Sequence, residues 1–190
     1  MNGCINWKQG LAAGALAASI LAGAPMAGAA TQDGAVGQTS TGTVDVQILV
    51  PNLVLVENLD SITLNYAPGG GDVSVAEPFC VWATPGTLYD ITISSLTNTG
   101  TVDFVATGAA SNVNYNVEFD DNVAGISWEN VTEGTTLDNG GSGYTPANNA
   151  SPGCAADNSA LRVTAVESGN LAAATEGVYG DTLTLLVTPN

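Results

Sequence analysis

From residue 41 to its end, the sequence is a succession of short stretches with the apolar–polar alternation of β-strands. The first stretch is TGTVDVQILV at residues 41–50, where valine or isoleucine occupies every even position from 44 to 50. Turn residues such as Pro68-Gly69-Gly70-Gly71-Asp72 separate the stretches. No helical period of useful length follows residue 30. The pattern therefore predicts an all-β sandwich.

Ten strands follow from this alternation, at residues 44–50, 53–56, 61–65, 79–82, 89–94, 102–106, 113–119, 126–128, 161–166 and 182–187. The stretch 131–157 is rich in Gly, Asn, Thr and Ser, and it is expected to be a surface excursion. The run Ala172-Ala173-Ala174 is expected to form a single helical turn at most.

Residues 1–30 have the pattern of a cleaved secretory signal peptide. Lys8 precedes an apolar run at 11–24, and small residues follow up to Ala30. The run is shorter than the roughly 20 residues that a membrane-spanning helix needs. Cleavage after Ala29 or Ala30 fits, and Cys4 is not placed for a lipoprotein anchor. The remaining 160 residues of 190 suffice for one domain and are not expected to span a membrane.

The charge balance excludes several classes of partner. All 18 acidic residues follow residue 30, where Arg162 is the only base. Removing the single charge of Lys8 with the signal peptide changes the formal net charge from −16 to −17. Such a surface repels phosphate backbones and anionic membranes, so binding to nucleic acid is not expected.

Two cysteines remain after the signal peptide, Cys80 and Cys154. In a secreted chain an even pair predicts a disulfide, with two free buried thiols as the alternative. A bridge over this separation contributes about 4 kcal/mol in the chain-entropy model.

The residue types needed for common catalytic chemistry are missing. Histidine is absent and the only lysine is Lys8, which removes Ser-His-Asp catalysis, Schiff-base chemistry and a Lys–Asn crosslink. The cluster Asp120-Asp121-Asn122 is expected to be a polar turn, with a calcium site as the alternative. Trp82 and Trp128 are expected in the core, with a sugar-stacking platform as the alternative. We therefore expect neither an enzyme nor a cofactor.

Four stretches, in order, resemble the archaic chaperone–usher pilins, the family that contains the spore coat protein U-like domain. They are TGTVDVQILV at 41–50, FCVW at 79–82 followed by Pro85 and YDITI at 89–93, VNYNV at 113–117 followed by Asp120-Asp121, and GVYGDTLTL at 177–185. Together they cover most of the chain beyond the signal peptide.

The resemblance implies an immunoglobulin-like sandwich that lacks its last strand and is completed by donor-strand exchange. A periplasmic chaperone would first lend a strand, and at the outer-membrane usher the N-terminal segment of the next identical subunit would replace it. The product would be a fimbria on the cell surface, with a role in adhesion or biofilm formation.

This resemblance also implies roles for particular residues. Residues 31–50 would be a flexible leader and donor strand, and residues 51–190 the pilin domain. The donor side chains would be Val44, Val46, Ile48 and Val50. In the C-terminal strand, the side chains that border the acceptor groove or contact a chaperone would be Leu183, Leu185 and Val187.

The sequence departs from the family pattern in two places. The stretch 51–56 has no cysteine to pair with Cys80, so the bridge to Cys154 would be rewired. The chain ends in Thr188-Pro189-Asn190 instead of the aromatic ending often found in the family.

Two other functional classes remain open at this point. One is a self-complete secreted sandwich that binds carbohydrate, or acts as an adhesin or surface-layer protein, with its first strand in its own sheet. The other is a glycosidase, which needs two carboxylates flanking a cleft. With 18 acidic residues some such pair is inevitable, so the sequence gives this class little support.

Overall fold

The computed structural model describes residues 34–97, 103–124, 126–147 and 152–190. The chain divides into two units, residues 1–49 and 50–190. The predicted signal peptide lies outside the described residues. In the ranges that are described, no helix is long and apolar enough to cross a membrane.

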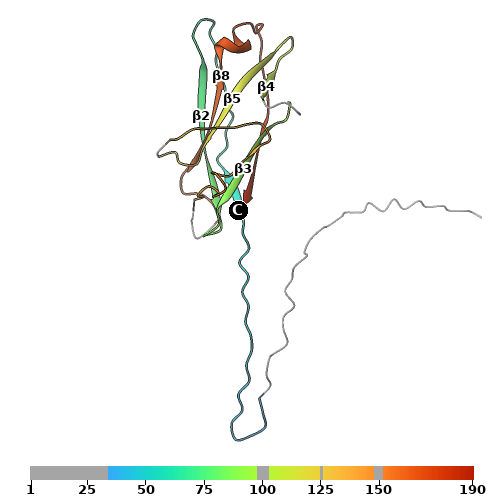
Figure 1. The fold of residues 1–190 in the computed structure, drawn as a ribbon, viewed down its shortest axis with the longest axis vertical. Helices are drawn as coiled ribbons and strands as arrows, with labels where there is room; N and C mark the ends of the chain where they lie inside the picture. Colours follow the sequence, from blue (N-terminus) through green and yellow to red (C-terminus); the bar gives the residue numbers. More distant parts are fainter. Residues whose placement is uncertain (1–33, 98–102, 125, 148–151) are drawn as a thin grey trace, which may run out of the picture. The chain divides into compact units, whose positions relative to one another are not determined.

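Residues 50–190 form two antiparallel sheets (Figure 1). The first sheet has the strand order β1-β2-β8-β5-β4, and the short strand β6 also pairs with β5. Its strands are β1 (Val54–Glu57), β2 (Val73–Ala83), β4 (Phe104–Thr107), β5 (Asn112–Asp120), β6 (Glu129–Asn130) and β8 (Ser159–Ala165).

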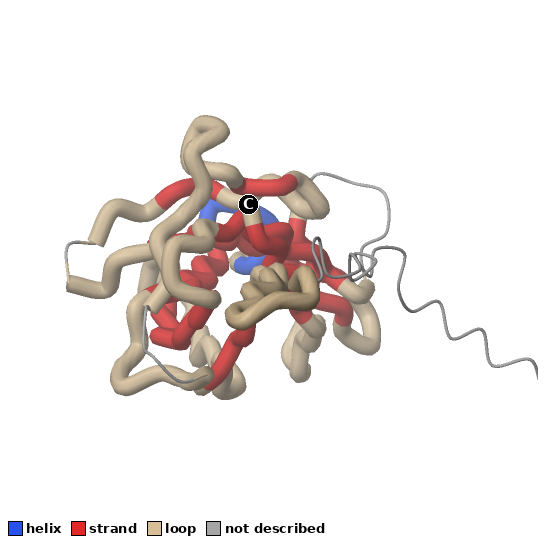
Figure 2. The backbone as a smooth tube through the Cα atoms, turned by 90° about the horizontal axis from the view of Figure 1, so that it is seen from below, coloured by secondary structure: helices blue, strands red, loops and turns tan. Residues whose placement is uncertain are grey.

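The second sheet has three strands in the order β7-β3-β9. They are β7 (Thr136–Leu137), β3 (Tyr89–Ser95) and β9 (Leu183–Pro189). A short helical segment, η1 (Glu167–Leu171), follows β8. Seen from below, the strands lie among loops that surround them (Figure 2).

The core lies between the two sheets because successive side chains of a strand point to opposite faces. In β5, Val113, Tyr115 and Val117 are buried while the asparagines between them are exposed. In β3, Tyr89 and Ile91 are wholly buried. Each large side chain of this kind contributes roughly 1.5–3 kcal/mol when it is fully buried. The all-β sandwich predicted from alternation is therefore confirmed.

The structure departs from the predicted strands at residues 73–79 and 126–128, among other places. Strand β2 begins at Val73, because residues 73–79 pair with β8 along their whole length. The sequence does not predict this part of the strand, because it contains the polar Ser74 and Glu77 and a proline at 78. No strand is assigned to residues 126–128, and the next two residues form β6 instead.

The prediction that residues 131–157 are a surface excursion is wrong in part. Val131, Leu137 and Tyr144 belong to the core, and Tyr144 is only 3% exposed. Tyr144 exchanges backbone hydrogen bonds with Tyr89, and β7 pairs with β3. These apolar residues are too widely spaced among polar ones to produce a strand-like period.

The predicted disulfide between Cys80 and Cys154 is confirmed. Cys80 is wholly buried in β2. The bridge attaches the long connection before β8 to the first sheet.

Candidate functional site: an open sheet edge

Strand β9 lies at the end of the second sheet, so only one of its edges is paired. Residues 183–189 pair with β3 along their whole length. Within the described part of the chain, no strand pairs with the other edge. Its inward side chains, Leu183, Leu185 and Val187, are half-buried against the core, whereas Leu186 on the outer face is exposed.

The segment 61–66 is the second part of this region. Ile62, Leu64 and Tyr66 are half-buried against the core, and the residues between them are exposed. Such alternation is typical of a strand with one face on a core. Yet the segment pairs with no strand and makes no backbone–backbone hydrogen bond among the described residues. The strand predicted at 61–65 thus has the side-chain pattern of a strand but no partner.

We use the name open edge for the unpaired edge of β9 together with the segment 61–66. The segment continues the chain from β1, and β1 lies close to β9. Unpaired N–H and C=O groups on a sheet edge are a template for a further strand. Half-buried aliphatic side chains beside them give that strand an apolar surface to cover.

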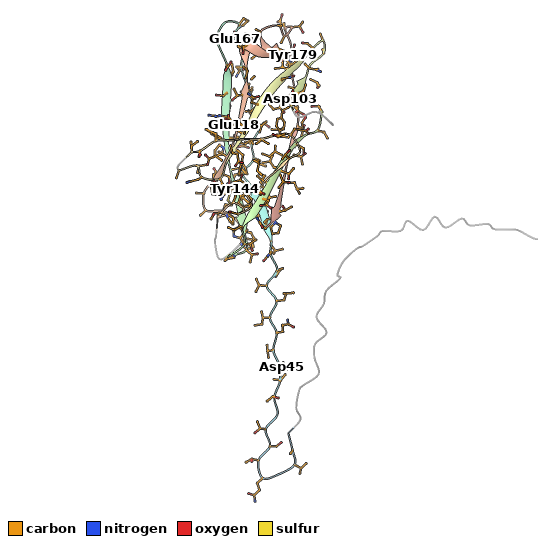
Figure 3. The ribbon with its side chains drawn as sticks, viewed as in Figure 1. Asp45, Asp103, Glu118, Tyr144, Glu167 and Tyr179 are labelled. Atoms are coloured by element: carbon orange, nitrogen blue, oxygen red, sulfur yellow. A yellow bond between two sulfur atoms is a disulfide. The ribbon has the colours of Figure 1, made fainter. Side chains whose placement is uncertain are left out.

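Glu167 holds the far end of the segment in place. Its carboxylate accepts hydrogen bonds from the Tyr66 hydroxyl at 2.8 Å and from the backbone N–H groups of Gly69 at 2.7 Å and Gly71 at 3.0 Å. The hydrogen bond from Tyr66, followed by that from Gly69, lowers the pKa of Glu167. Figure 3 shows Glu167 and Tyr179 at the same end of the domain.

Asp181 holds the start of β9. Its carboxylate accepts hydrogen bonds from the hydroxyls of Ser95 at 2.6 Å, Thr97 at 2.5 Å and Tyr115 at 2.6 Å. Burial alone would raise the pKa of Asp181, but the bonds from Ser95, Thr97 and Tyr115 outweigh it and lower the pKa. The edge of β9 is thereby attached to both sheets.

Tyr179 forms a tyrosine corner just before β9. Its hydroxyl donates to the backbone oxygen of Thr175 at 2.7 Å, the type of contact that a tyrosine corner makes in immunoglobulin-like sandwiches. The ring covers Gly108, where an added Cβ would lie 2.6 Å from a ring carbon.

At the other end of the domain, the chain enters and leaves beside one loop, residues 84–88. The Thr84 N–H donates to the backbone oxygen of Leu53 at 2.9 Å, and the Asn190 N–H donates to that of Leu88 at 2.9 Å. The open edge therefore extends from the entry point of the domain to the end held by Glu167 and Asp181.

The residues predicted to form a donor strand are exposed and have no strand assigned to them. The exposed fractions are 76% for Val44, 80% for Val46, 83% for Ile48 and 66% for Val50. Four aliphatic side chains on alternate positions therefore remain uncovered.

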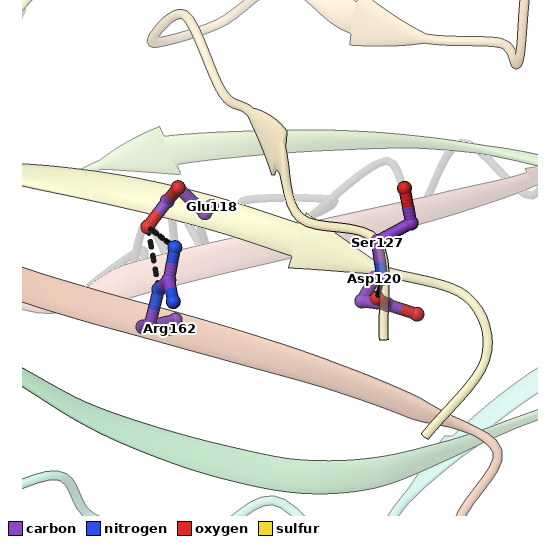
Figure 4. Close-up of polar contacts among 4 residues, drawn as sticks. All are labelled: Glu118, Asp120, Ser127 and Arg162. Carbon is purple, nitrogen blue, oxygen red and sulfur yellow. Dashed lines mark hydrogen bonds and ion pairs between the residues drawn. The ribbon is translucent and has the colours of Figure 1, made fainter. Parts of the chain in front are cut away.

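The alternative of a sugar platform made of two tryptophans is wrong. Trp82 is 5% exposed and pairs with Ala147 in an isolated bridge. The ring of Trp128 is covered by the guanidinium of Arg162, whose carbon lies 4.5 Å from the ring centroid. Arg162 also pairs with Glu118 at 2.6 Å (Figure 4).

The acidic turn has a structural role in this fold. Asp120 is buried at the end of β5 and accepts hydrogen bonds from the backbone N–H groups of Asn122 and Ser127. Figure 4 shows Asp120 beside Ser127. Over the described residues, no group of three or more acidic or cysteine side chains is arranged to hold a metal ion.

Sequence reasoning predicted the inward residues of β9 but assigned no role to Ile62, Leu64 and Tyr66. The alternation in SITLNY at 61–66 predicts only a strand. The carboxylates of Glu167 and Asp181 were also missed, because the hydroxyl groups that bind them, and the Gly69 and Gly71 amides that bind Glu167, are 66 or more positions away in the sequence.

Comparison with known proteins supports the fold assignment. No family model matches the sequence. No curated protein matches it either. Among solved structures, the chain is similar to a chain of a chaperone–tip adhesin complex described as vital for the activation of CFA/I fimbriae biogenesis. The TM-score is 0.51 at 16% sequence identity, and the match covers 72% of this chain but 41% of that one. The protein thus shares its all-β fold with a chain of a fimbrial chaperone–adhesin complex.

Proposed function

We propose that this protein is a structural, non-enzymatic subunit of a surface fimbria, related to the spore coat protein U-like pilins, which polymerises by donor-strand exchange. The observation that carries the proposal is the open edge, which combines unpaired backbone groups with half-buried aliphatic side chains. The fimbrial fold neighbour supports the same role.

The occupant of the open edge would be residues 44–50 of a second copy of the chain. Val44, Val46, Ile48 and Val50 project from one face of an extended segment, as do Leu183, Leu185 and Val187 on β9. A strand added at a sheet edge gains backbone hydrogen bonds and places alternate side chains on the core. Each aliphatic side chain contributes roughly 1.5–3 kcal/mol if fully buried.

Insertion of each copy into the next does not close on itself, so it generates a filament. Before assembly, a chaperone strand would cover the same edge, and an outer-membrane usher would mediate the exchange. The protein would reach the cell surface through the periplasm after removal of residues 1–30, and the fimbria would serve adhesion or biofilm formation.

Deletion of residues 31–48 tests the proposal. We expect the purified deletion protein to remain monomeric by light scattering, and to bind a fluorescent synthetic peptide of residues 41–50. The product of the full-length sequence should form fibres visible by electron microscopy. Fibres with normal subunit spacing from the deletion protein would contradict donor-strand exchange.

A matched pair of substitutions tests the face of the strand that is buried. Val46→Asp adds a charge on the face predicted to enter the open edge, whereas Gln47→Asp adds the same charge on the opposite face. Because burial of an unpaired charge is strongly unfavourable, we expect Val46→Asp to reduce fibre yield roughly tenfold or more. Equal yields from the two variants would contradict the assignment.

A further inference from the structure

We propose that the linker of Pro51, Asn52 and Leu53 prevents residues 44–50 from folding back onto their own domain, and so leaves them free to pair with a second copy. This inference rests on the proposed function, because it concerns which copy of the segment occupies the open edge. It concerns three residues between the candidate donor strand and β1.

Thr84 and Thr87 hold the linker in line with β1. The Leu53 N–H donates to the Thr84 hydroxyl at 3.0 Å, and this hydroxyl donates to the Pro51 backbone oxygen at 3.1 Å. The Thr87 hydroxyl donates to the Asn52 side-chain oxygen at 3.2 Å. These bonds attach the linker to the 84–88 loop.

Chain length excludes one way of folding back. In a strand antiparallel to β9, Val50 would have to lie near Leu183. At about 3.4 Å per residue, the two ends of β9 are about 20 Å apart. The four steps from Val50 to Val54 span at most about 14 Å. Because Leu53 is attached to Thr84 at the Pro189 end, this orientation is open only to another copy.

Another route is a hairpin in which the segment pairs with the free edge of β1. A two-residue loop of Pro51 and Asn52 would need a positive φ at its first position, which proline cannot adopt. Neither residue has a positive φ in the structure. The register is also wrong, because Leu49 would lie opposite Val54 and the even-numbered valines would face outward.

A three-residue loop corrects the register but meets a different obstacle. Val50 would then lie opposite Val54, and the aliphatic face of the segment would point to the core. Such loops place their third residue in the left-handed conformation, where glycine is preferred. In this chain the third residue is Leu53, whose side chain disfavours that conformation. The hairpin would also break the hydrogen bonds between Leu53 and Thr84.

The experiment replaces Leu53 in the protein expressed from the full-length sequence. Leu53→Gly should raise the ratio of self-capped to open monomer roughly 5- to 30-fold, because glycine adopts the left-handed conformation freely. Under conditions where the wild type polymerises, the variant should form fibres more slowly, and its monomer should bind the labelled 41–50 peptide correspondingly less. Leu59→Gly is the matched control, since Leu59 is 46% exposed and Leu53 is 51% exposed.

Thr84→Val provides a second variant that leaves the linker sequence unchanged. It removes the hydroxyl that binds Leu53 and Pro51, so it should shift peptide binding in the same direction by a smaller factor. Wild-type rates of polymerisation and peptide binding in folded Leu53→Gly protein would overturn the role of the linker alone. Failure of the wild type to polymerise through residues 44–50 would overturn the proposed function, and the linker role with it.

Discussion

Asp181 gathers three hydroxyl groups at the point where β9 begins. Hydrogen bonds to an ionised carboxylate are stronger than those between neutral groups. The hydrogen bonds from Ser95 and Thr97 attach Asp181 to the end of β3 and to the residues that follow it. The bond from Tyr115 attaches Asp181 to β5 of the other sheet. A single side chain thus joins the two sheets at one end of the open edge.

Asp181→Asn should lower the free energy of unfolding by roughly 1.5–3 kcal/mol at neutral pH, because the charge-assisted hydrogen bonds weaken. Since the folded-state pKa of Asp181 lies below its ordinary value of 3.8, its contribution is complete above that value. It is lost as the pH falls through the lowered pKa. Urea unfolding of both proteins at pH 7 and near pH 2 measures the difference.

The exposed Asp60→Asn provides the control, since it removes the same charge from a side chain that faces solvent. Its unfolding should stay close to that of the wild type at both pH values. If the free energy of unfolding of Asp181→Asn lies below that of the wild type by the same amount at both pH values, the carboxylate charge does not stabilise β9.

At the scale of elements, the connection that precedes β8 acts as an extension of the first sheet. Just before β8, the side chain of Asn158 continues the contact with β2. It accepts a hydrogen bond from the Val81 N–H at 2.8 Å and donates one to the Val81 oxygen at 3.2 Å. Ala147 donates to the same oxygen at 2.9 Å. The disulfide between Cys80 and Cys154 lies beside these contacts and closes the connection onto β2.

Replacement of both cysteines by alanine should lower the free energy of unfolding by about 4 kcal/mol, since the bridge closes a long loop in the unfolded chain. Denaturant titration with and without reductant measures the loss. Reductant should destabilise the wild type by a similar amount and leave the double variant unchanged. Equal stability of the two oxidised proteins would show that side-chain contacts alone hold the connection.

At the scale of the whole molecule, charge opposes contact between copies. Apart from Arg162, every charged side chain beyond residue 30 is acidic. Arg162 is engaged with Glu118 and Trp128. Copies that approach one another therefore repel until salt screens their charges, so in the proposed fibre the apolar side chains of the open edge would have to supply the attraction.

Polymerisation should accordingly speed up with ionic strength. Between about 10 mM and 1 M salt the screening length falls from about 30 Å to about 3 Å. We expect the initial rate of fibre growth, followed by light scattering, to rise several-fold over this range. A rate that falls with salt would mean that attraction between opposite charges drives assembly.

The strands with strict alternation were predictable, because their side chains by themselves report one buried and one exposed face. Residues 113–119 and 89–94 are of this kind. The first half of β2 and the buried Tyr144 were not, because their burial depends on partners distant in sequence: β8 for the former and Tyr89 for the latter. For the same reason, the carboxylate of Glu167 gave no signal that it binds Tyr66.

The sequence alone determined the β-class, the disulfide and the acidic surface, since alternation, cysteine number and charge are local or compositional properties. It also indicated the aliphatic face of residues 44–50. Only the tertiary structure decided that β9 and the segment 61–66 lack partners among the described residues, because pairing is a property of two strands. The position of Pro51–Leu53 against Thr84 was likewise decided by the fold, where a hydroxyl 31 positions from Leu53 lies within hydrogen-bonding distance.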